Sequence, residues 1–278
     1  MDSRFIKTLL SVVDTGSFAG AARCENLTPA TVSQRVRSLE AELGEVLIVR
    51  AGQKVMPTAA CLSVIDRMRH IAGEIRQIST DLDATRLCGQ VHVGAISTAL
   101  ADWVPDVLAR FVQQAPKVSL NIIPGTSADL FKKLTNEEID AAFLIKPPFK
   151  IPKSLVLTPI EAQPFVFIAQ SEDKRTIDEI IATEQALIYD PNSWGGRLIS
   201  TWLNQQISSE KILCELDALE AIATAIGQGL GYSIVPDWHG LTKNKSIRRI
   251  PLPMIDFYRE LVLLHRRLNP EVLKLLQP

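Results

Sequence analysis

The chain has 278 residues, of which 46% are hydrophobic and 22% charged, and its formal net charge is −1. This balance is typical of a globular protein, and the length favours more than one core, because single cores commonly stop growing at roughly 250 residues. The sequence shows no signal-peptide pattern and no run of about 18 apolar residues, which predicts a cytoplasmic protein without a membrane partner. The near-neutral charge excludes a uniformly basic protein, so a nucleic-acid partner would need a local cationic patch.

The cysteines and histidines are too scattered for the usual spacings of zinc sites or disulfide frameworks. We therefore expect no metal and no cofactor, and we expect the cysteines to serve as small buried hydrophobic residues. The residues concerned are Cys24, Cys61, Cys88, Cys214, His70, His92, His239 and His265.

The first thirty residues carry the start signals of three helices. Apolar residues recur at helical spacing from Phe5 to Val13, and "DTGSF" then interrupts the pattern. Ser17 can cap a short second helix. Thr28 is a good N-cap and Pro29 suits the first helical position, so a third helix is predicted to begin there.

The third helix is predicted to have one apolar and one polar face. Val32, Val36, Leu39 and Leu43 fall on the apolar side, which should pack on the first two helices. Small side chains, hydrogen-bonding side chains and arginines suit close approach to base edges and phosphates in a major groove, although a merely solvated surface remains an alternative. The predicted DNA contacts on this helix are Thr28, Ala30, Thr31, Ser33, Gln34, Arg35, Arg37 and Ser38.

The segments "VLIVR", "AGQK" and "VMPT" predict two short strands joined by a tight turn. Arg50 and Lys54 bracket this turn and add cationic contacts. Three helices followed by a basic hairpin predict a winged helix-turn-helix over residues 1–58, with one helix in the major groove and the wing over the backbone or the minor groove.

The segments "GSFAGAA", "LTPATVSQRVRSLEAELG", "LIVR" and "PTAA" resemble the N-terminal signature of the LysR-type transcriptional regulators over residues 3–62. Two departures stand out. The family usually has Ser-Gln-Pro where this chain has Thr28, Pro29 and Ala30, so a glutamine that often contacts DNA is absent. A leucine that is usual before the turn is replaced by Glu25.

Residues 59–88 are predicted to form a linker helix. Its apolar residues are spaced 4, 3, 4, 3 and 4 apart, which is the heptad pattern of a helix that dimerises, although an amphipathic helix packed on its own domain is an alternative. A two-fold dimer should read an interrupted palindrome of double-stranded promoter DNA. The resemblance also implies that dimers pair into tetramers, and RNA polymerase is a candidate partner. The seam residues are Val64, Met68, Ile71, Ile75, Ile78 and Leu82.

From Gly89 onward short strands alternate with helical segments, among them "QVHVGAI", "VSLNIIP" and "IDAAFLI". This order predicts an α/β domain with a mostly parallel sheet and helices on both faces. Residues 99–114 and 195–206 are expected to be helical, and "SLVLTPI" and "PFVFIAQ" to be two strands.

In element order, the second part resembles the effector-binding region of the same family, which has two Rossmann-like subdomains joined by two crossing strands, like a periplasmic solute-binding protein. The resemblance places subdomain one at residues 89–160 and 264–278 and subdomain two at residues 161–263, with a ligand cleft between them.

Hydroxyl side chains follow several predicted strands, at the sheet edge where open α/β folds bind ligands. They predict a site for a small carboxylate effector, although each could instead be only a helix cap. Ser97, Thr98, Thr126, Ser127 and Ser193 supply hydroxyls, and Asn192 lies beside them. Trp194 is a candidate wall, and Arg197 a candidate charge partner. Lys146 is a weaker one, since surface decoration is its more common role.

These predictions describe an oligomeric DNA-binding regulator rather than an enzyme. A solute receptor for transport would need an export signal and no DNA-reading head. An enzyme on a bilobed fold is the other alternative, but the sequence contains no G-x-S-x-G, H-E-x-x-H or phosphate-loop motif.

Overall fold

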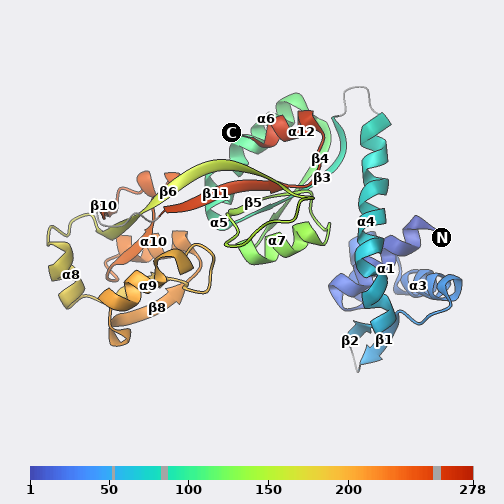
Figure 1. Ribbon diagram of the computed structural model, residues 1–278, viewed down its shortest axis with the longest axis horizontal. Helices are drawn as coiled ribbons and strands as arrows, with labels where there is room; N and C mark the ends of the chain where they lie inside the picture. The colour runs from blue at the N-terminus through green and yellow to red at the C-terminus, as the bar shows by residue number, and fades with distance from the viewer. Residues whose placement is uncertain (52–53, 83–86, 253–257, 278) are drawn as a thin grey trace. The chain divides into compact units, whose positions relative to one another are not determined.

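The computed structural model describes residues 1–51, 54–82, 87–252 and 258–277. The chain forms two compact units: Met1–Gly89 with Thr135–Glu138, and the remainder from Gln90 to Pro278. The helices and strands of both units are drawn in Figure 1. No helix in the described ranges has the length and apolar character needed to cross a membrane.

The first unit begins with three helices, α1 (Ser3–Thr15), α2 (Phe18–Glu25) and α3 (Pro29–Leu43). The predicted caps are confirmed, since the side chain of Ser17 accepts from the N–H of Gly20 and that of Thr28 from the N–H of Thr31. Glycines with positive φ, Gly16 and Gly44, end α1 and α3, because a left-handed residue there costs glycine little. The helices pack through a core that includes Leu9, Val32, Val36 and Leu39.

A hairpin of β1 (Ile48–Ala51) and β2 (Lys54–Pro57) follows, with antiparallel pairing from Ile48↔Pro57 to Ala51↔Lys54. The N–H of Val55 donates to the carbonyl of Gly16 at 3.0 Å and so attaches the hairpin to the α1–α2 turn. Residues 52 and 53 of the turn and the side chain of Lys54 lie outside the described residues.

Helix α4 (Ala59–Leu82) begins where predicted but is shorter than the expected span of residues 59–88, since Cys88 already belongs to β3. Its apolar seam divides into two parts. Met68 is 4% exposed in the core of the first unit, and Val64 and Ile71 are partly buried against that core. Ile75 and Ile78 are 41% and 55% exposed. The early part of the seam therefore packs on its own domain, because it lies beside α1, and only the later part is open to a partner helix. The side chain of Leu82 is outside the described set.

The second unit has two lobes. Lobe one contains β3 (Cys88–Ala95), β4 (Lys117–Pro124) and β5 (Ala141–Ile145) with α5 (Ser97–Asp102), α6 (Val104–Gln114), α7 (Ser127–Thr135) and α12 (Pro270–Leu276). The helix expected over residues 99–114 is two helices, because the chain turns at Trp103 and Pro105 opens the second. Strands β3 and β5 are parallel and lie next to each other.

Lobe two contains β7 (Ala186–Tyr189), β8 (Ile212–Leu216), β9 (Ser233–Pro236) and β10 (Ile247–Pro251). Its helices are α8 (Ile177–Thr183), α9 (Arg197–Gln206), α10 (Leu219–Gly227) and α11 (His239–Thr242), with a 3₁₀ turn at Ser209–Lys211. Strands β7 and β8 are parallel. The buried side chains of β7 share a core with Ile222 and Ile226 of α10, and the apolar side chains of β8 pack against that core partly buried.

Two long strands cross between the lobes. The segments expected as separate strands form one strand, β6 (Val156–Gln170), and β11 (Tyr258–His265) runs antiparallel beside its first half (Figure 1). The second half of β6 pairs with β9 and β10 in lobe two. The sheets are thus mixed rather than mostly parallel. Because β11 pairs with β5 from Leu261, the chain is back in lobe one before residue 264.

Candidate DNA-reading surface and ligand cleft

The outer face of α3 is open over the residues predicted to meet DNA. Val32, Val36 and Leu39 are buried, which fixes the helix and turns the opposite face outward. Gln34 and Arg37 are exposed there. A shallow hollow on this face is lined by Ala30, Ser33, Gln34, Arg37, Ser38 and Ala41.

Arg35 differs from the prediction, because its guanidinium is directed into the first unit. Its Nη1 lies 3.3 Å from Oε2 of Glu25 and 3.2 Å from Oγ1 of Thr8. The hydroxyl of Thr8 also donates to Glu25 Oε2 at 2.8 Å. Glu25, whose side chain is 7% exposed, is therefore accommodated inside the domain by an arginine and a threonine, and Arg35 serves this internal cluster.

Thr28 and Thr31 combine a capping role with a position at the start of α3. Their hydroxyls lie 2.9 Å apart, and Thr28 also accepts from the backbone N–H of Thr31. On the wing, Arg50 is exposed and its guanidinium lies 5.9 Å from the centre of the Phe18 ring. Such a contact can orient an arginine without neutralising its charge.

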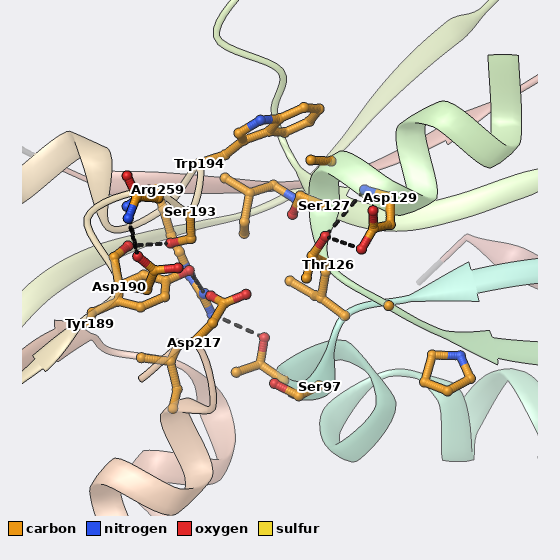
Figure 2. A pocket seen from close by; sticks show the side chains of 18 of the residues that line it. Ser97, Thr126, Ser127, Asp129, Tyr189, Asp190, Ser193, Trp194, Asp217 and Arg259 are labelled. Atoms are coloured by element: carbon orange, nitrogen blue, oxygen red, sulfur yellow. Dashed lines mark hydrogen bonds between the residues drawn. The ribbon is translucent and has the colours of Figure 1, made fainter. Parts of the chain in front are cut away.

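The second unit contains a cavity of about 500 Å³ between its lobes. The wall from lobe one carries Thr126, Ser127 and Asp129, and it faces Tyr189, Asp190, Ser193 and Asp217 from lobe two (Figure 2). Ser97, Thr98 and Trp194 also line it, so the cavity brings together the hydroxyl and aromatic residues predicted from the sequence. Arg197 is exposed and is not among the described lining residues.

The hydroxyls of lobe one have different roles. Thr126 Oγ1 accepts from the N–H of Asp129 at 3.2 Å and donates to the Asp129 carboxylate at 2.9 Å, so it caps α7. Ser127 Oγ accepts from the N–H of Ile145 at 3.1 Å and ties α7 to the end of β5. Ser97 is exposed in the cavity. A ligand would therefore meet the Ser97 hydroxyl more readily than that of Thr126.

Two aspartates stand at the carboxyl ends of neighbouring strands in lobe two. Asp190 follows β7 and Asp217 follows β8, and the register pairs Tyr189 with Leu216 immediately before them. The N–H of Asp190 donates to the carbonyl of Leu216 at 3.0 Å. Desolvation by the cleft wall and the nearby Asp190 carboxylate raise the pKa of Asp217.

Arg259 of β11 is, like the two aspartates, a cavity residue that the sequence analysis missed. It is 1% exposed, and it donates from Nε to Gln163 Oε1 at 2.7 Å and from Nη2 to Thr98 Oγ1 at 3.0 Å. A longer contact of 3.4 Å joins Nη1 to the hydroxyl of Tyr189. All these acceptors are uncharged, and burial lowers the pKa of the guanidinium.

The two cations proposed from the sequence lie elsewhere. Lys146 pairs with Glu260 at 2.7 Å and is half exposed, as expected for a surface ion pair. Arg197 opens α9, where its N–H donates to the carbonyl of Ser193. The signal that could have found Arg259 is its position in the strand pattern, because it stands two and four residues before the buried Leu261 and Leu263 of β11 and thus in the same phase.

Three aromatic rings from the two lobes meet beside the cavity, which Trp194 also lines. Trp194 of lobe two lies 5.8 Å from Phe131 and 5.4 Å from Phe149 of lobe one, and Phe131 lies 5.1 Å from Phe149, all edge to face. Edge-to-face pairs at these distances stabilise by about 0.5 to 1.5 kcal/mol each. The trio therefore holds the two lobes against each other beside the cavity.

Comparison with protein families matches almost the whole chain. A model described as bacterial regulatory helix-turn-helix protein, lysR family, matches residues 3–62, and one described as LysR substrate binding domain matches residues 84–276. The HTH-type transcriptional activator IlvY of Salmonella typhimurium is 26% identical over 245 residues, covering 85% of this chain and 83% of that protein.

Solved structures share the fold over nearly the full length. Full-length OxyR of Pseudomonas aeruginosa superposes with a TM-score of 0.72 at 19% identity, covering 99% of this chain and 93% of that one. Full-length CbnR complexed with its target DNA superposes with a TM-score of 0.62 at 19% identity, covering 99% and 97%.

Proposed function

This chain belongs to the LysR family of bacterial regulatory helix-turn-helix proteins. We propose that it binds promoter DNA as a homodimer or homotetramer, and that its binding to this DNA changes when a small carboxylate metabolite enters its cleft. It acts in the cytoplasm, on an interrupted palindrome, and turns over no substrate.

The DNA-binding part of the proposal is supported by the outer face of α3. The hollow there carries Gln34 and Arg37 with small residues around them and no carboxylate. Such a face can approach base edges closely and offers both a base-reading amide and a phosphate-binding cation. The structural relative CbnR was crystallised with its target DNA, which is in keeping with this role.

The effector part rests on one observation, the buried guanidinium of Arg259. Buried charges in proteins are normally paired with opposite charges, because an isolated one is costly to desolvate. The described hydrogen bonds of Arg259 all go to uncharged oxygens. Of its five N–H groups, these bonds use three, and the nearby carboxylates of Asp217 and Glu220 act on it through their charge. A ligand carboxylate in the cavity would therefore find a buried cation with further donors.

The test begins with sequencing the DNA that co-purifies with the protein, since neighbouring promoters point to the operator and to the pathway of the metabolite. Operator binding is then measured with and without that metabolite, and metabolite affinity by titration calorimetry. Arg259→Met should weaken metabolite binding by about ten- to hundredfold, as expected for loss of a charge-assisted contact.

Arg197→Met provides the matched control, because it removes an arginine of the same unit from outside the cavity lining. It should bind the metabolite as the parent does. Arg259→Lys keeps the charge and checks that the Arg259→Met result is not a folding defect. Equal affinity of the Arg259→Met variant and the parent would argue against the effector assignment, and failure to bind any recovered DNA would argue against the regulator.

A further inference from the structure

The cleft carries more negative than positive charge. Asp129, Asp190 and Asp217 line it, whereas Arg259 is the cation among the described lining residues. Glu220 of α10 adds a further carboxylate, whose Oε1 is buried without a hydrogen-bond partner. Its charge acts on both Asp217 and Arg259. A ligand bearing only negative charge would be attracted by one group and repelled by several.

The excess charge is concentrated on lobe two, at the ends of β7 and β8. Asp190 uses Oδ1 to accept from the backbone N–H of Asn192 at 2.8 Å and from its side-chain amide at 3.1 Å. Asp217 is exposed to the cavity. Among the described ion pairs none joins a lysine or arginine to either aspartate. The side of the cleft that faces Asp217 therefore favours a cation.

A positively charged group, the guanidinium of Arg259, lies close to these aspartates. Arg259 lines the same cavity and acts electrostatically on Asp217, so an anionic and a cationic group must bind next to each other. Ser97 adds an exposed hydroxyl on the side of lobe one. A volume of about 500 Å³ holds a molecule of metabolite size.

We propose that the effector is a small zwitterion of the amino-acid type, whose ammonium group faces Asp190 and Asp217 and whose carboxylate faces Arg259 and Ser97. This inference rests on the proposed function, because it names the class of metabolite that the regulatory cleft binds. A simple dicarboxylate would leave Asp217 facing a like charge, and a simple amine would leave the buried guanidinium without an anion.

Three matched series of probes test the inference on the full chain by titration calorimetry and thermal shift. The first series is the common L-amino acids, the second the corresponding 2-oxo acids, which lack the ammonium group, and the third the corresponding decarboxylated amines. At least one amino acid should bind, and its oxo acid and amine should each bind at least about tenfold more weakly.

Asp217→Asn should reduce the affinity for that amino acid by about ten- to hundredfold. The ratio of the affinities for the amino acid and the matched oxo acid should become smaller. Glu215→Gln is the control, because Glu215 is an exposed acid of β8 outside the cavity lining. It should leave both affinities unchanged. If Asp217→Asn does not fold, the affinity of Asp190→Asn for the amino acid tests the same charge. Competition between the amino acid and its oxo acid for the parent protein then shows which of the two binds more tightly.

The inference is overturned if oxo acids bind more tightly than amino acids and if Asp217→Asn increases the affinity for oxo acids. In that case the cleft still binds a metabolite and the proposed function stands. Absence of binding by all three series at millimolar concentration also overturns it. The proposed function fails separately, if no operator is recovered or if the metabolite of the neighbouring genes leaves operator binding unchanged.

Discussion

Arg35 and Arg37 lie two positions apart on α3 and face different surroundings. Two residues correspond to about 200° around a helix, so both cannot lie on the same face. Arg37 is exposed in the hollow of the outer face, whereas Arg35 turns inward to Glu25 and Thr8. The two side chains carry the same charge, but Arg37 should contribute to DNA binding and Arg35 to the stability of the fold.

The first prediction separates these properties. Arg37→Ala should weaken operator binding and reduce the dependence of log Kd on log salt by about one unit, because one phosphate contact is lost. Arg35→Ala should instead lower the free energy of unfolding by about 1 to 3 kcal/mol, since Glu25 loses a partner inside the domain. The salt dependence of operator binding by the Arg35→Ala variant should stay near that of the parent.

Gel-shift titrations at several salt concentrations and denaturant unfolding measure the two quantities. Arg67→Ala is the control for both, because Arg67 is exposed on α4. A reduced salt slope for Arg35→Ala together with unchanged stability would show that Arg35 leaves Glu25 and contacts DNA.

The second prediction concerns Asp217 and follows from its raised pKa. Desolvation and the Asp190 charge raise this pKa above the ordinary value of 3.8, so between the two values the folded protein binds more protons than the unfolded one. The contribution of Asp217 to stability therefore falls as the pH rises through this window. Above it, the ionised side chain destabilises the fold.

Asp217→Asn should accordingly raise the melting temperature at pH 7 while it weakens effector binding, and the gain should disappear at pH 3, where the aspartate is protonated. Glu215→Gln provides the comparison in thermal melts at both values. A lower melting temperature for Asp217→Asn at pH 7 would show that its carboxylate stabilises the fold. Gain of stability on removal of a side chain is expected where a residue is kept for binding.

The residues of the cleft could be predicted from the sequence only in part. Ser97, Thr98, Thr126, Ser127 and Ser193 were found because helix and strand periodicity shows where strands end, and ligands bind at such ends. Arg259 was missed because its place in the cavity depends on β11 returning beside β6, a pairing of residues about a hundred positions apart. Asp190 and Asp217 were missed because their proximity depends on the β7–β8 register.

At the scale of elements, α4 combines two packing roles that one heptad pattern cannot distinguish. Met68 is buried in the core of the first unit, whereas Ile75 and Ile78 are exposed apolar residues further along the same helix. The pattern records that a position is apolar but not which surface covers it. The prediction of dimerisation through this helix therefore rests on its second half.

The third prediction tests that half. Ile75→Glu would place two like charges against each other in an apolar helix pair, so the dimer should dissociate, and operator affinity should fall because one head makes half the contacts. Leu62→Glu is the matched control, since Leu62 is also exposed and apolar on α4 but lies off the seam. It should remain dimeric in sedimentation at micromolar concentration. Survival of the Ile75→Glu dimer would place the oligomer contact elsewhere.

The crossing strands show a further limit of sequence patterns. "SLVLTPI" and "PFVFIAQ", which contain Pro159 and Pro164, were expected as two strands. The chain continues through both as β6, whose first half pairs with β11 and whose second half pairs with β9 and β10. Pro159 lies opposite Val262, where the register between β6 and β11 shifts, and Pro164 lies at the end of that pairing, opposite Tyr258. Proline is tolerated at a bulge and at the end of a ladder, because the missing N–H need not belong to a continuous ladder.

At the scale of the second unit, the cavity has walls from both lobes, and the rings of Trp194, Phe131 and Phe149 join the lobes beside it. A ligand that contacts both walls binds the closed arrangement more tightly than an open one. Its binding free energy is then available to shift the two lobes, which is the property a regulator needs from its effector domain.

The last prediction follows from the coupling of the two binding reactions. If the effector changes operator affinity by some factor, the operator must change effector affinity by the same factor, because both describe one thermodynamic cycle. Couplings of this kind are typically about 1 to 3 kcal/mol, or roughly 5- to 150-fold. Calorimetry of the effector against protein alone and against protein saturated with operator duplex gives one factor, and gel shifts at zero and saturating effector give the other. A duplex of scrambled sequence at the same concentration controls for charge effects. Equal effector affinity with and without operator, beside a changed operator affinity, would show that the two measurements report different reactions, because the metabolite acts on operator binding through a change of oligomeric state or through a second site.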